Sequence, residues 1–214
     1  SKKFSLHGIK KLRELILELA VRGKLVPQDP NDEPASVLLE RIAAEKAQLV
    51  KDKKIKKPKA LPEISEDEKP FELPKGWEWS SNALLFTLIK GKKPKVLSEK
   101  NIGYPYLDIE ALDRNNINRY TDDEKCPIST ENDLLVVCDG SRSGLVLDGK
   151  YGVIGSTLAR IDTQEYLQPY IKLFFRQSFR HLNTSMKGAA IPHLDTKALR
   201  EGFLALPPLS EQQR

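Results

Sequence analysis

The first fifty residues carry apolar positions at helical spacing. Four of them share one helical face at intervals of three, four and three residues: Ile9, Leu12, Ile16 and Leu19. We therefore predict an amphipathic helix over residues 6–22. Ser5 is a suitable cap for its start and Gly23 for its end.

A second helix is predicted from Pro34 to about Lys51, because proline fits the first helical turn and Leu38 and Ile42 share one side. Two such helices cannot bury a core alone. They either pack on each other and on the rest of the chain, or dock on another protein or on a helix outside this sequence. Residues 52–72 hold three prolines and runs of charge, which predicts a linker.

From residue 73 the pattern changes to short apolar runs separated by turn residues, which is typical of β-strands. These runs cover residues 83–89, 104–109, 134–138, 144–147, 153–161 and 202–206. Asp148-Gly149, between two of them, predicts a hairpin turn. Helical patterns cover 167–179 and 196–201. The predicted fold class is α+β, a domain of short mixed strands and few helices preceded by an N-terminal helical segment.

Composition excludes several protein classes. Among the 214 residues no apolar run approaches the roughly 18–20 needed to span a bilayer, and the first residues do not resemble a signal peptide. Cys126 and Cys138 form neither a metal-site spacing nor a disulfide framework. We therefore expect a soluble, cytoplasmic protein without a membrane partner. The net charge of +5 comes mostly from residues 46–59, which suit a solvated tether or an auxiliary phosphate contact.

Catalytic motifs are absent or weak. The sequence lacks an Asn/Asp-Pro-Pro-aromatic loop for methyl transfer, a phosphate-cradling G-x-x-x-x-G-K-[ST] loop and paired histidines. We therefore predict no catalytic residue, no metal and no bound cofactor. Asp139, Asp148 and Lys150 match the letters of a metal-dependent nuclease, in which carboxylates hold a divalent ion. That alternative stays open, although Asp148-Gly149 also fits a turn.

Four polar loops are suited to DNA contact. Lysine side chains bind phosphates, arginine can form two hydrogen bonds with guanine, and asparagine can form two with adenine. The first three of these loops also contain glycines, which allow close approach of the backbone. The candidate DNA-binding residues are Lys90, Lys92, Lys93 and Lys95 in the first loop, Ser141, Arg142 and Ser143 in the second, Lys187 and His193 in the third, and Arg114, Asn115 and Asn116 in the fourth.

The end of the sequence predicts the start of a further helix. Ser210 and Gln213 have the spacing of a capping box, in which the serine side chain accepts from the third helical N–H. A helix is therefore expected to begin at residue 210. Because only one turn of it is present, we expect the sequence to be a fragment of a longer protein.

Several segments resemble type I restriction–modification specificity subunits. Arg22-Gly-Lys-Leu-Val-Pro-Gln-Asp-Pro-Asn-Asp-Glu-Pro-Ala-Ser36, continued by Leu39-Glu-Arg-Ile42, is similar to a signature of that family. Leu73-Pro-Lys-Gly-Trp-Glu-Trp79 resembles the entry to a target recognition domain and Leu206-Pro-Pro-Leu-Ser-Glu-Gln-Gln-Arg214 its exit. Ala190-Ile-Pro-His-Leu194 resembles a late element of such a domain.

The resemblance implies a particular architecture. Two recognition domains, separated by conserved spacer helices, would each bind half of a bipartite target in double-stranded DNA. Catalysis would belong to partners, namely methyltransferase (modification) subunits that bind S-adenosylmethionine and a restriction motor–nuclease subunit that uses ATP. The apolar residues that would meet spacer helices or the methyltransferase are Ile9, Leu12, Ile16, Leu19, Leu38 and Ile42.

These expectations divide the chain into four parts. They are a helical segment over 1–51, a linker over 52–72, a DNA target recognition domain over 73–209 and the start of a truncated spacer helix over 210–214. The principal hypothesis is a non-catalytic DNA-recognition module. The alternatives are the nuclease already described and a helical assembly adaptor that does not contact DNA.

Overall fold

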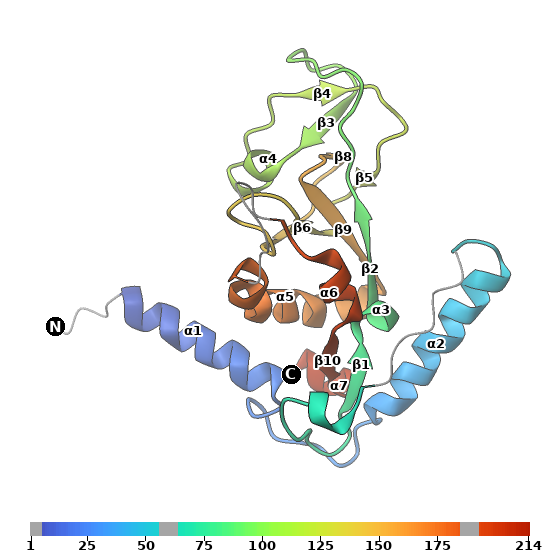
Figure 1. Cartoon of the computed structure of the whole chain (residues 1–214), viewed down its shortest axis with the longest axis vertical. Helices are drawn as coiled ribbons and strands as arrows, with labels where there is room; N and C mark the ends of the chain where they lie inside the picture. Colours follow the sequence, from blue (N-terminus) through green and yellow to red (C-terminus); the bar gives the residue numbers. More distant parts are fainter. Residues whose placement is uncertain (1–5, 56–63, 185–192) are drawn as a thin grey trace. The chain divides into compact units, whose positions relative to one another are not determined.

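The computed structural model describes residues 6–55, 64–184 and 193–214 (Figure 1). The chain divides into two compact units. The first combines residues up to 85 with residues 199–214, and the second comprises residues 86–198. The expected boundary at residue 73 therefore differs from the observed division, because the first β-strand after it pairs with the end of the chain.

Helix α1 (Leu6–Val21) ends as its sequence predicts. Gly23 has a left-handed φ of 65°, its N–H donates to the carbonyl of Ala20, and the N–H of Lys24 donates to the carbonyl of Leu19. This pair of bonds is a Schellman motif, which satisfies carbonyls at the helix end. The predicted cap Ser5 lies outside the described residues.

The apolar stripes of the first two helices have different surroundings. On α1, Ile9, Leu12, Leu15 and Ile16 are 40–57% exposed. In helix α2 (Ala35–Lys51), Leu38 and Ile42 are buried. Figure 1 shows α1 and α2 as separate helices that do not lie side by side. Leu38 and Ile42, which the sequence assigned to a partner surface, therefore belong to the core of the first unit instead.

The described part of the expected linker folds onto the first unit. A short 3₁₀ helix, η1 (Glu66–Glu68), begins with a capping box between Ser65 and Glu68. Phe71 then packs on Trp79 with ring centroids 5.0 Å apart, and the guanidinium of Arg22 lies over the Phe71 ring. Aromatic contacts of this kind order a segment that its proline content alone would leave extended.

A two-stranded antiparallel sheet closes the first unit. Strand β1 (Glu78–Ser81) pairs with β10 (Phe203–Leu206), and helix α3 (Asn82–Leu85) follows β1. Residues 82–85 were expected to be extended. They form a helical turn because the buried Asn82 donates its side-chain N–H to the carbonyl of Leu199 and its backbone N–H to that of Gly202.

Helix α7 (Leu209–Gln213) begins one residue earlier than expected. Pro208 occupies the cap position and no side chain caps the helix, so the prediction of a Ser210–Gln213 capping box is wrong. The preceding prolines direct the chain into the helix, since proline presets a φ compatible with its first turn. None of the helices in the described ranges is both long and apolar enough to cross a membrane.

The second unit contains two four-stranded sheets. One has the order β2-β9-β6-β7 and is antiparallel throughout, with strands β2 (Phe86–Lys90), β9 (Leu158–Thr163), β6 (Leu134–Val137) and β7 (Val146–Asp148). The other has the order β4-β3-β8-β5, with strands β4 (Tyr120–Thr121), β3 (Tyr104–Leu107), β8 (Gly152–Ile154) and β5 (Ile128–Ser129). Only β3 and β8 in it run parallel. One antiparallel sheet and one mixed sheet, together with the helices, confirm the α+β class.

The predicted hairpin at Asp148-Gly149 is wrong. Strand β7 pairs with β6, whereas β8 pairs with β3 and β5, so the turn joins two different sheets. The Gly149 N–H donates to the carbonyl of Asp133, and a Cβ on Gly149 would lie 2.3 Å from the carbonyl oxygen of Thr130. Glycine is needed here for close backbone approach and not for a hairpin.

The core of the second unit joins both sheets to their helices. Leu107, Leu135, Val137, Ile154 and Leu158 pack with helix α4 (Ile109–Asp113). After the 3₁₀ helix η2 (Glu165–Leu167), helix α5 (Gln168–Thr184) buries Ile171 and Phe175, and the Phe175 ring packs at a tilt against Phe86. Helix α5 continues beyond the predicted end at residue 179, whereas helix α6 (Thr196–Glu201) has the predicted bounds.

Candidate nucleic-acid interface

The loop of residues 138–144 follows the buried strand β6 and is held in one conformation by its own backbone. Gly140 and Gly144 have φ values of 98° and 89°, which side chains other than glycine rarely adopt. The Ser143 hydroxyl is buried and donates to the carbonyl of Gly140. Ser143 therefore stabilises the loop, whereas Ser141 and Arg142 project from it.

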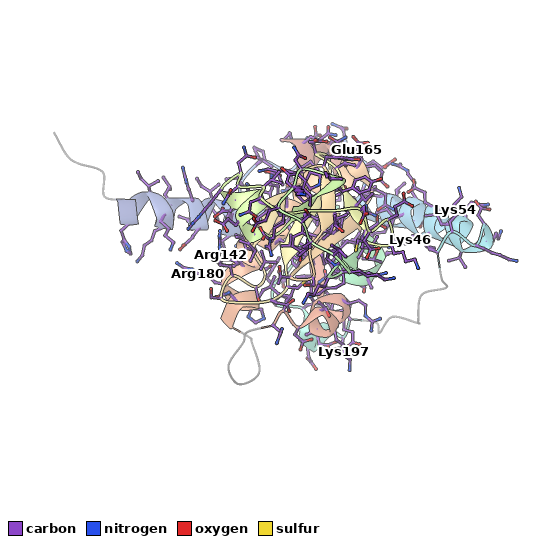
Figure 2. All side chains as sticks on the ribbon, turned by 90° about the horizontal axis from the view of Figure 1, so that it is seen from above. Lys46, Lys54, Arg142, Glu165, Arg180 and Lys197 are labelled. Atoms are coloured by element: carbon purple, nitrogen blue, oxygen red, sulfur yellow. The ribbon has the colours of Figure 1, made fainter. Side chains whose placement is uncertain are left out.

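Helix α5 supports the same loop from outside. The amide nitrogen of Asn183 donates to the carbonyls of Ser141 and Ser143 at 2.9 and 3.1 Å. A Cβ on Gly144 would lie 2.8 Å from the Cβ of Leu182, so the loop and the helix end are in close contact. Arg180 lies one turn before Asn183 on the same helix, and Figure 2 labels both Arg180 and Arg142.

Asp139 joins two of the predicted DNA-binding residues. Its carboxylate accepts from Lys90 Nζ at 2.9 Å and lies 2.7 Å from His193 Nδ1. Burial alone would raise the pKa of Asp139, but the hydrogen bonds with His193 and Lys90 outweigh it and lower that pKa. The end of β2 and the segment after residue 192 therefore meet at the 138–144 loop.

Arg142 brings a further predicted loop to the same place. Its Nη1 donates to Asp113 Oδ2 at 2.9 Å, and Asp113 is the last residue of α4. The hydrogen bond from Arg142 lowers the pKa of Asp113. Arg114 and Asn115 follow directly, with Asn115 in the left-handed region at a φ of 55°. The Asp113–Arg142 ion pair therefore connects the end of α4 to the 138–144 loop.

We call the residues of the 138–144 loop that make these contacts, together with their partners, the polar cluster. Its members come from five separate parts of the chain and are Lys90, Asp113, Asp139, Ser141, Arg142, Asn183 and His193. The ion pairs within it are exposed: 41% and 38% of the two side chains in the Arg142–Asp113 pair, and 49% of the Lys90 side chain. Exposed pairs contribute only about 0–1 kcal/mol, so these cations can exchange a carboxylate for another anion at little cost.

Asn115 and Asn116 already have protein partners near the polar cluster. The Asn115 side-chain oxygen accepts from Lys150 Nζ at 2.8 Å, and the Asn116 amide donates to Glu110 at 3.2 Å. Arg114 is exposed beside them. These contacts fix the turn after α4 and orient the predicted adenine-reading amides before any DNA is present.

Lys92 and Lys95 contact a different part of the second unit. Lys92 Nζ donates to the carbonyl of Lys125, and the backbone N–H of Lys95 donates to Asp123. Lys93 is exposed. The first predicted loop is therefore divided, with Lys90 in the polar cluster and the later lysines beside the 123–125 turn. Lys187 lies outside the described residues.

The three residues of the nuclease alternative do not converge. Asp148 is paired with Leu134 across β6 and β7, whereas Asp139 lies five residues beyond Leu134 and past the end of β6, which is about 16 Å of extended chain. Asp148 forms an ion pair with Lys172, and Lys150 donates to Ala111 and Asn115. The described ranges contain no group of three or more His, Cys, Asp or Glu residues suited to a metal ion.

Sequence reasoning missed three members of the polar cluster. Asp113 and Asp139 are carboxylates and were not considered for a DNA-binding surface, because their sign opposes that of phosphate. Asn183 lies beyond residue 179, where the helix was expected to end. The continuation of α5 through Phe179 and Leu182, at helical spacing from Phe175, is the pattern that could have indicated it.

Relatives of this chain belong to one functional group. It is 73% identical over 96 residues to the type I restriction enzyme EcoAI specificity subunit and 74% over 86 residues to the EcoEI specificity subunit, both from Escherichia coli. These matches cover 45% and 40% of the chain but only 16% and 14% of the relatives. The MjaVIII specificity subunit of Methanocaldococcus jannaschii is 33% identical over 67% of the chain and 35% of that protein.

Solved structures share the fold at low sequence identity. The HsdS subunit from Thermoanaerobacter tengcongensis matches with a TM-score of 0.54 at 16% identity, over 98% of this chain and 44% of that one. A chain from a structural study of complex assembly in the type I R-M system matches with a TM-score of 0.58 at 17% identity, over 97% and 48%. The family model described as type I restriction modification DNA specificity domain matches residues 74–214. Because this match covers well over half of the chain, the chain belongs to the type I restriction modification DNA specificity domain family.

Proposed function

We propose that this chain is a DNA-reading module of a type I specificity subunit, and that its second unit recognises one half of a bipartite target in double-stranded DNA. The observation that carries this proposal is the polar cluster, in which loops far apart in sequence converge on the rigid 138–144 loop. Recognition borne by loops on a rigid scaffold requires such convergence. The family match covers all of these loops.

The proposed module makes two kinds of contact with DNA, one with base edges and one with phosphates. Arg142 projects from the fixed loop and is suited to the O6 and N7 atoms of a guanine in the major groove. Lys90 and His193 both contact the carboxylate of Asp139 in the same loop, and Arg114, Asn115 and Asn116 follow Asp113, the partner of Arg142. Lys92, Lys93 and Lys95 lie apart from the cluster and suit phosphate contacts, which add affinity without sequence preference.

The proposed module makes and breaks no covalent bond. Methyl transfer with S-adenosylmethionine and ATP-driven restriction would be the work of the modification and motor–nuclease subunits that assemble with it in the cytoplasm. The exposed stripe of α1, with Ile9, Leu12 and Ile16, supports contact between this chain and such helical partners. Leu19 on the same stripe is partly buried.

Exchange of the second unit tests the proposal directly. Residues 86–198 of the full-length subunit are replaced by the corresponding segment of a relative that directs methylation to another sequence. The methylated motif is then read genome-wide in cells that also make the partner subunits. We expect one half of the motif to change to that of the donor while the other half stays the same. An unchanged motif contradicts the proposal.

Salt dependence distinguishes DNA recognition from the adaptor hypothesis. Binding of the assembled methyltransferase to its target duplex should weaken steeply between low and high salt, because neutralised phosphates release counterions. Replacing the wild-type second unit should alter that binding, whereas an adaptor that does not touch DNA would leave it unaltered. A separate assay for DNA cleavage tests the nuclease alternative. Asp148→Ala should abolish cleavage if that alternative holds, and should change little if this chain only recognises DNA.

A further inference from the structure

We infer that Asp113 is a positioning residue that aims Arg142 at a guanine. The inference rests on the proposed function and names a specificity-determining carboxylate within it. A carboxylate on a surface that binds DNA needs an explanation, because phosphates repel it. The simplest one is that the carboxylate orients a cationic side chain that contacts a base. Arg142 is the residue that Asp113 contacts.

The geometry leaves the reading edge of the guanidinium available. Arg142 donates through Nη1 to Asp113 Oδ2 at 2.9 Å, and in the described part of the chain this is the polar partner of its side chain. A guanidinium carries five N–H donors in a planar fork. With Nη1 engaged, the Nε and Nη2 edge remains for the paired acceptors O6 and N7 of guanine.

Both sides of the Arg142–Asp113 contact are held by separate anchors. Asn183 and the Gly144–Leu182 contact fix the loop that carries Arg142. Helix α4, which carries Asp113, is capped at its start by Asp108, whose side chain accepts from the Ala111 N–H at 2.8 Å. The carbonyl of Ala111 in turn accepts from Lys150 Nζ at 2.8 Å. A carboxylate on a fixed element can therefore define the direction of the arginine.

The benefit of this arrangement is a pre-ordered side chain. A long, unpaired arginine samples many rotamers and loses that freedom when it binds, which weakens the contact with the correct base. A salt bridge to Asp113 restricts those rotamers beforehand. The carboxylate also repels phosphate and offers no donor to the acceptors of guanine, so it disfavours binding modes in which Arg142 is displaced from its base.

The test compares single and paired variants in the full-length subunit assembled with its partners. Methylation rates are measured on the wild-type target duplex and on duplexes with each base pair replaced in turn. We expect Arg142→Ala to reduce discrimination about 10- to 100-fold at one guanine. Asp113→Ala should reduce it about tenfold at the same guanine, since the guanidinium is misplaced but still present. The double variant should match Arg142→Ala alone.

A charge-swapped pair separates positioning from simple stabilisation. Asp113→Arg combined with Arg142→Asp restores an ion pair of the same composition, so we expect normal assembly and thermal stability with discrimination at that guanine still lost. Recovery of discrimination by the swap would overturn the inference. So would an Asp113→Ala effect on all duplexes alike, or at a base pair other than the one that Arg142 reads. Asp122→Ala, which removes an exposed carboxylate outside the cluster, is the matched control.

Further outcomes distinguish this inference from the proposed function. If Asp113→Ala does not assemble, Asp113→Asn carries the test, since it keeps the shape but loses the charge; full discrimination with Asn overturns the inference. If Arg142→Ala alters discrimination and Asp113→Ala does not, the positioning role is wrong and the DNA-reading function stands. If neither changes it, the role of both residues is wrong, and the exchange of residues 86–198 decides the function separately.

Discussion

Polar side chains form a buried network in the first unit and an exposed cluster in the second. In the first unit, Glu211 is only 6% exposed and accepts from Trp77 Nε1 and Gln28 Nε2, both at 2.8 Å. In the second unit, Arg142 and Asp113 lie at a similar distance of 2.9 Å, but about two fifths of each side chain is exposed. In both places a carboxylate accepts from nitrogen donors, but the donors to Glu211 are neutral and the contact is buried, whereas Arg142 is charged and its contact is exposed to solvent.

The difference separates structural polar contacts from recognition contacts. A buried polar group that loses its hydrogen-bond partner stays desolvated without compensation, which is unfavourable. The Trp77–Glu211–Gln28 network therefore stabilises the one arrangement of chain segments in which all of its hydrogen bonds form. Those segments are distant in sequence and come from both stretches of chain that make up the first unit. An exposed ion pair is worth little to stability because water competes for it, so its cation is available to a ligand. Burial is therefore the property that assigns a role to each polar cluster here.

The largest effect is expected from Glu211→Ala. It leaves the indole N–H of Trp77 buried without its acceptor, which should lower the free energy of unfolding by about 2–3 kcal/mol. Both tryptophans, Trp77 and Trp79, belong to the first unit, so their fluorescence during urea unfolding reports on that unit. Glu201→Ala, which removes an exposed carboxylate, should change the same quantity by less than about 0.5 kcal/mol. Equal losses would show that burial does not make the contacts of Glu211 more important to stability than those of an exposed carboxylate.

Arg142→Ala should affect recognition and spare the fold. We expect a loss of about 1–3 kcal/mol of discrimination at one base pair, measured by methylation of matched and substituted duplexes, with unfolding free energy changed by less than about 0.5 kcal/mol. Arg41→Ala breaks a comparable exposed ion pair in the first unit, with Glu33 at 2.7 Å, and should leave discrimination unaltered. Intact discrimination with Arg142→Ala would show that the exposed cluster is not a reading surface.

Lys93→Ala should weaken binding to all DNA sequences alike, by about 1 kcal/mol or less, because a phosphate contact carries no base information. The slope of log affinity against log salt should fall in magnitude by about one. Fluorescence anisotropy with target and unrelated duplexes measures both quantities, and Lys75→Ala, an exposed lysine of the first unit, is the control. A change confined to the target duplex would assign Lys93 to base reading instead.

The smallest effect is expected at acidic pH. Because the pKa of Asp139 is lowered in the folded state, its carboxylate stabilises the fold above the unfolded value of about 3.9, and that contribution is lost as the pH falls through the folded pKa. Asp139→Asn should therefore lower stability by about 0.5 kcal/mol at pH 7, with a deficit that shrinks below about pH 4. Urea unfolding at pH 7 and pH 3 measures the difference, and a constant deficit would exclude the carboxylate charge as its cause.

Local sequence patterns predicted the helices better than the strand pairings. The spacing of apolar residues identified α1, α2 and α6, since helix bonds connect residues only four positions apart. The prediction of a hairpin at Asp148-Gly149 was wrong because strand pairing depends on contacts throughout the sheet and not on the turn residues alone. Strand β7 returns to β6 across the 138–144 loop, and β8 joins residues about fifty positions earlier in β3.

The candidate site divides in the same way. Residue type and glycine content selected the loops around Lys90, Asn115, Arg142 and His193, because the chemistry of DNA contact is a property of the side chains themselves. Nothing local indicated that Asp139 would hold Lys90 and His193 together, or that Asp113 would meet Arg142. These contacts join residues 29 to 54 positions apart.

The amino-acid sequence by itself determined the family, the helical segments, the α+β class and the kinds of side chain offered to a partner, because all of these depend on residue identity and short-range spacing. Only the tertiary structure decided that Leu38 and Ile42 are buried while the stripe of α1 is exposed, and that the polar loops converge on residues 138–144. Burial and convergence follow from the packing of segments that are distant in the chain, and no local pattern encodes which segments will meet.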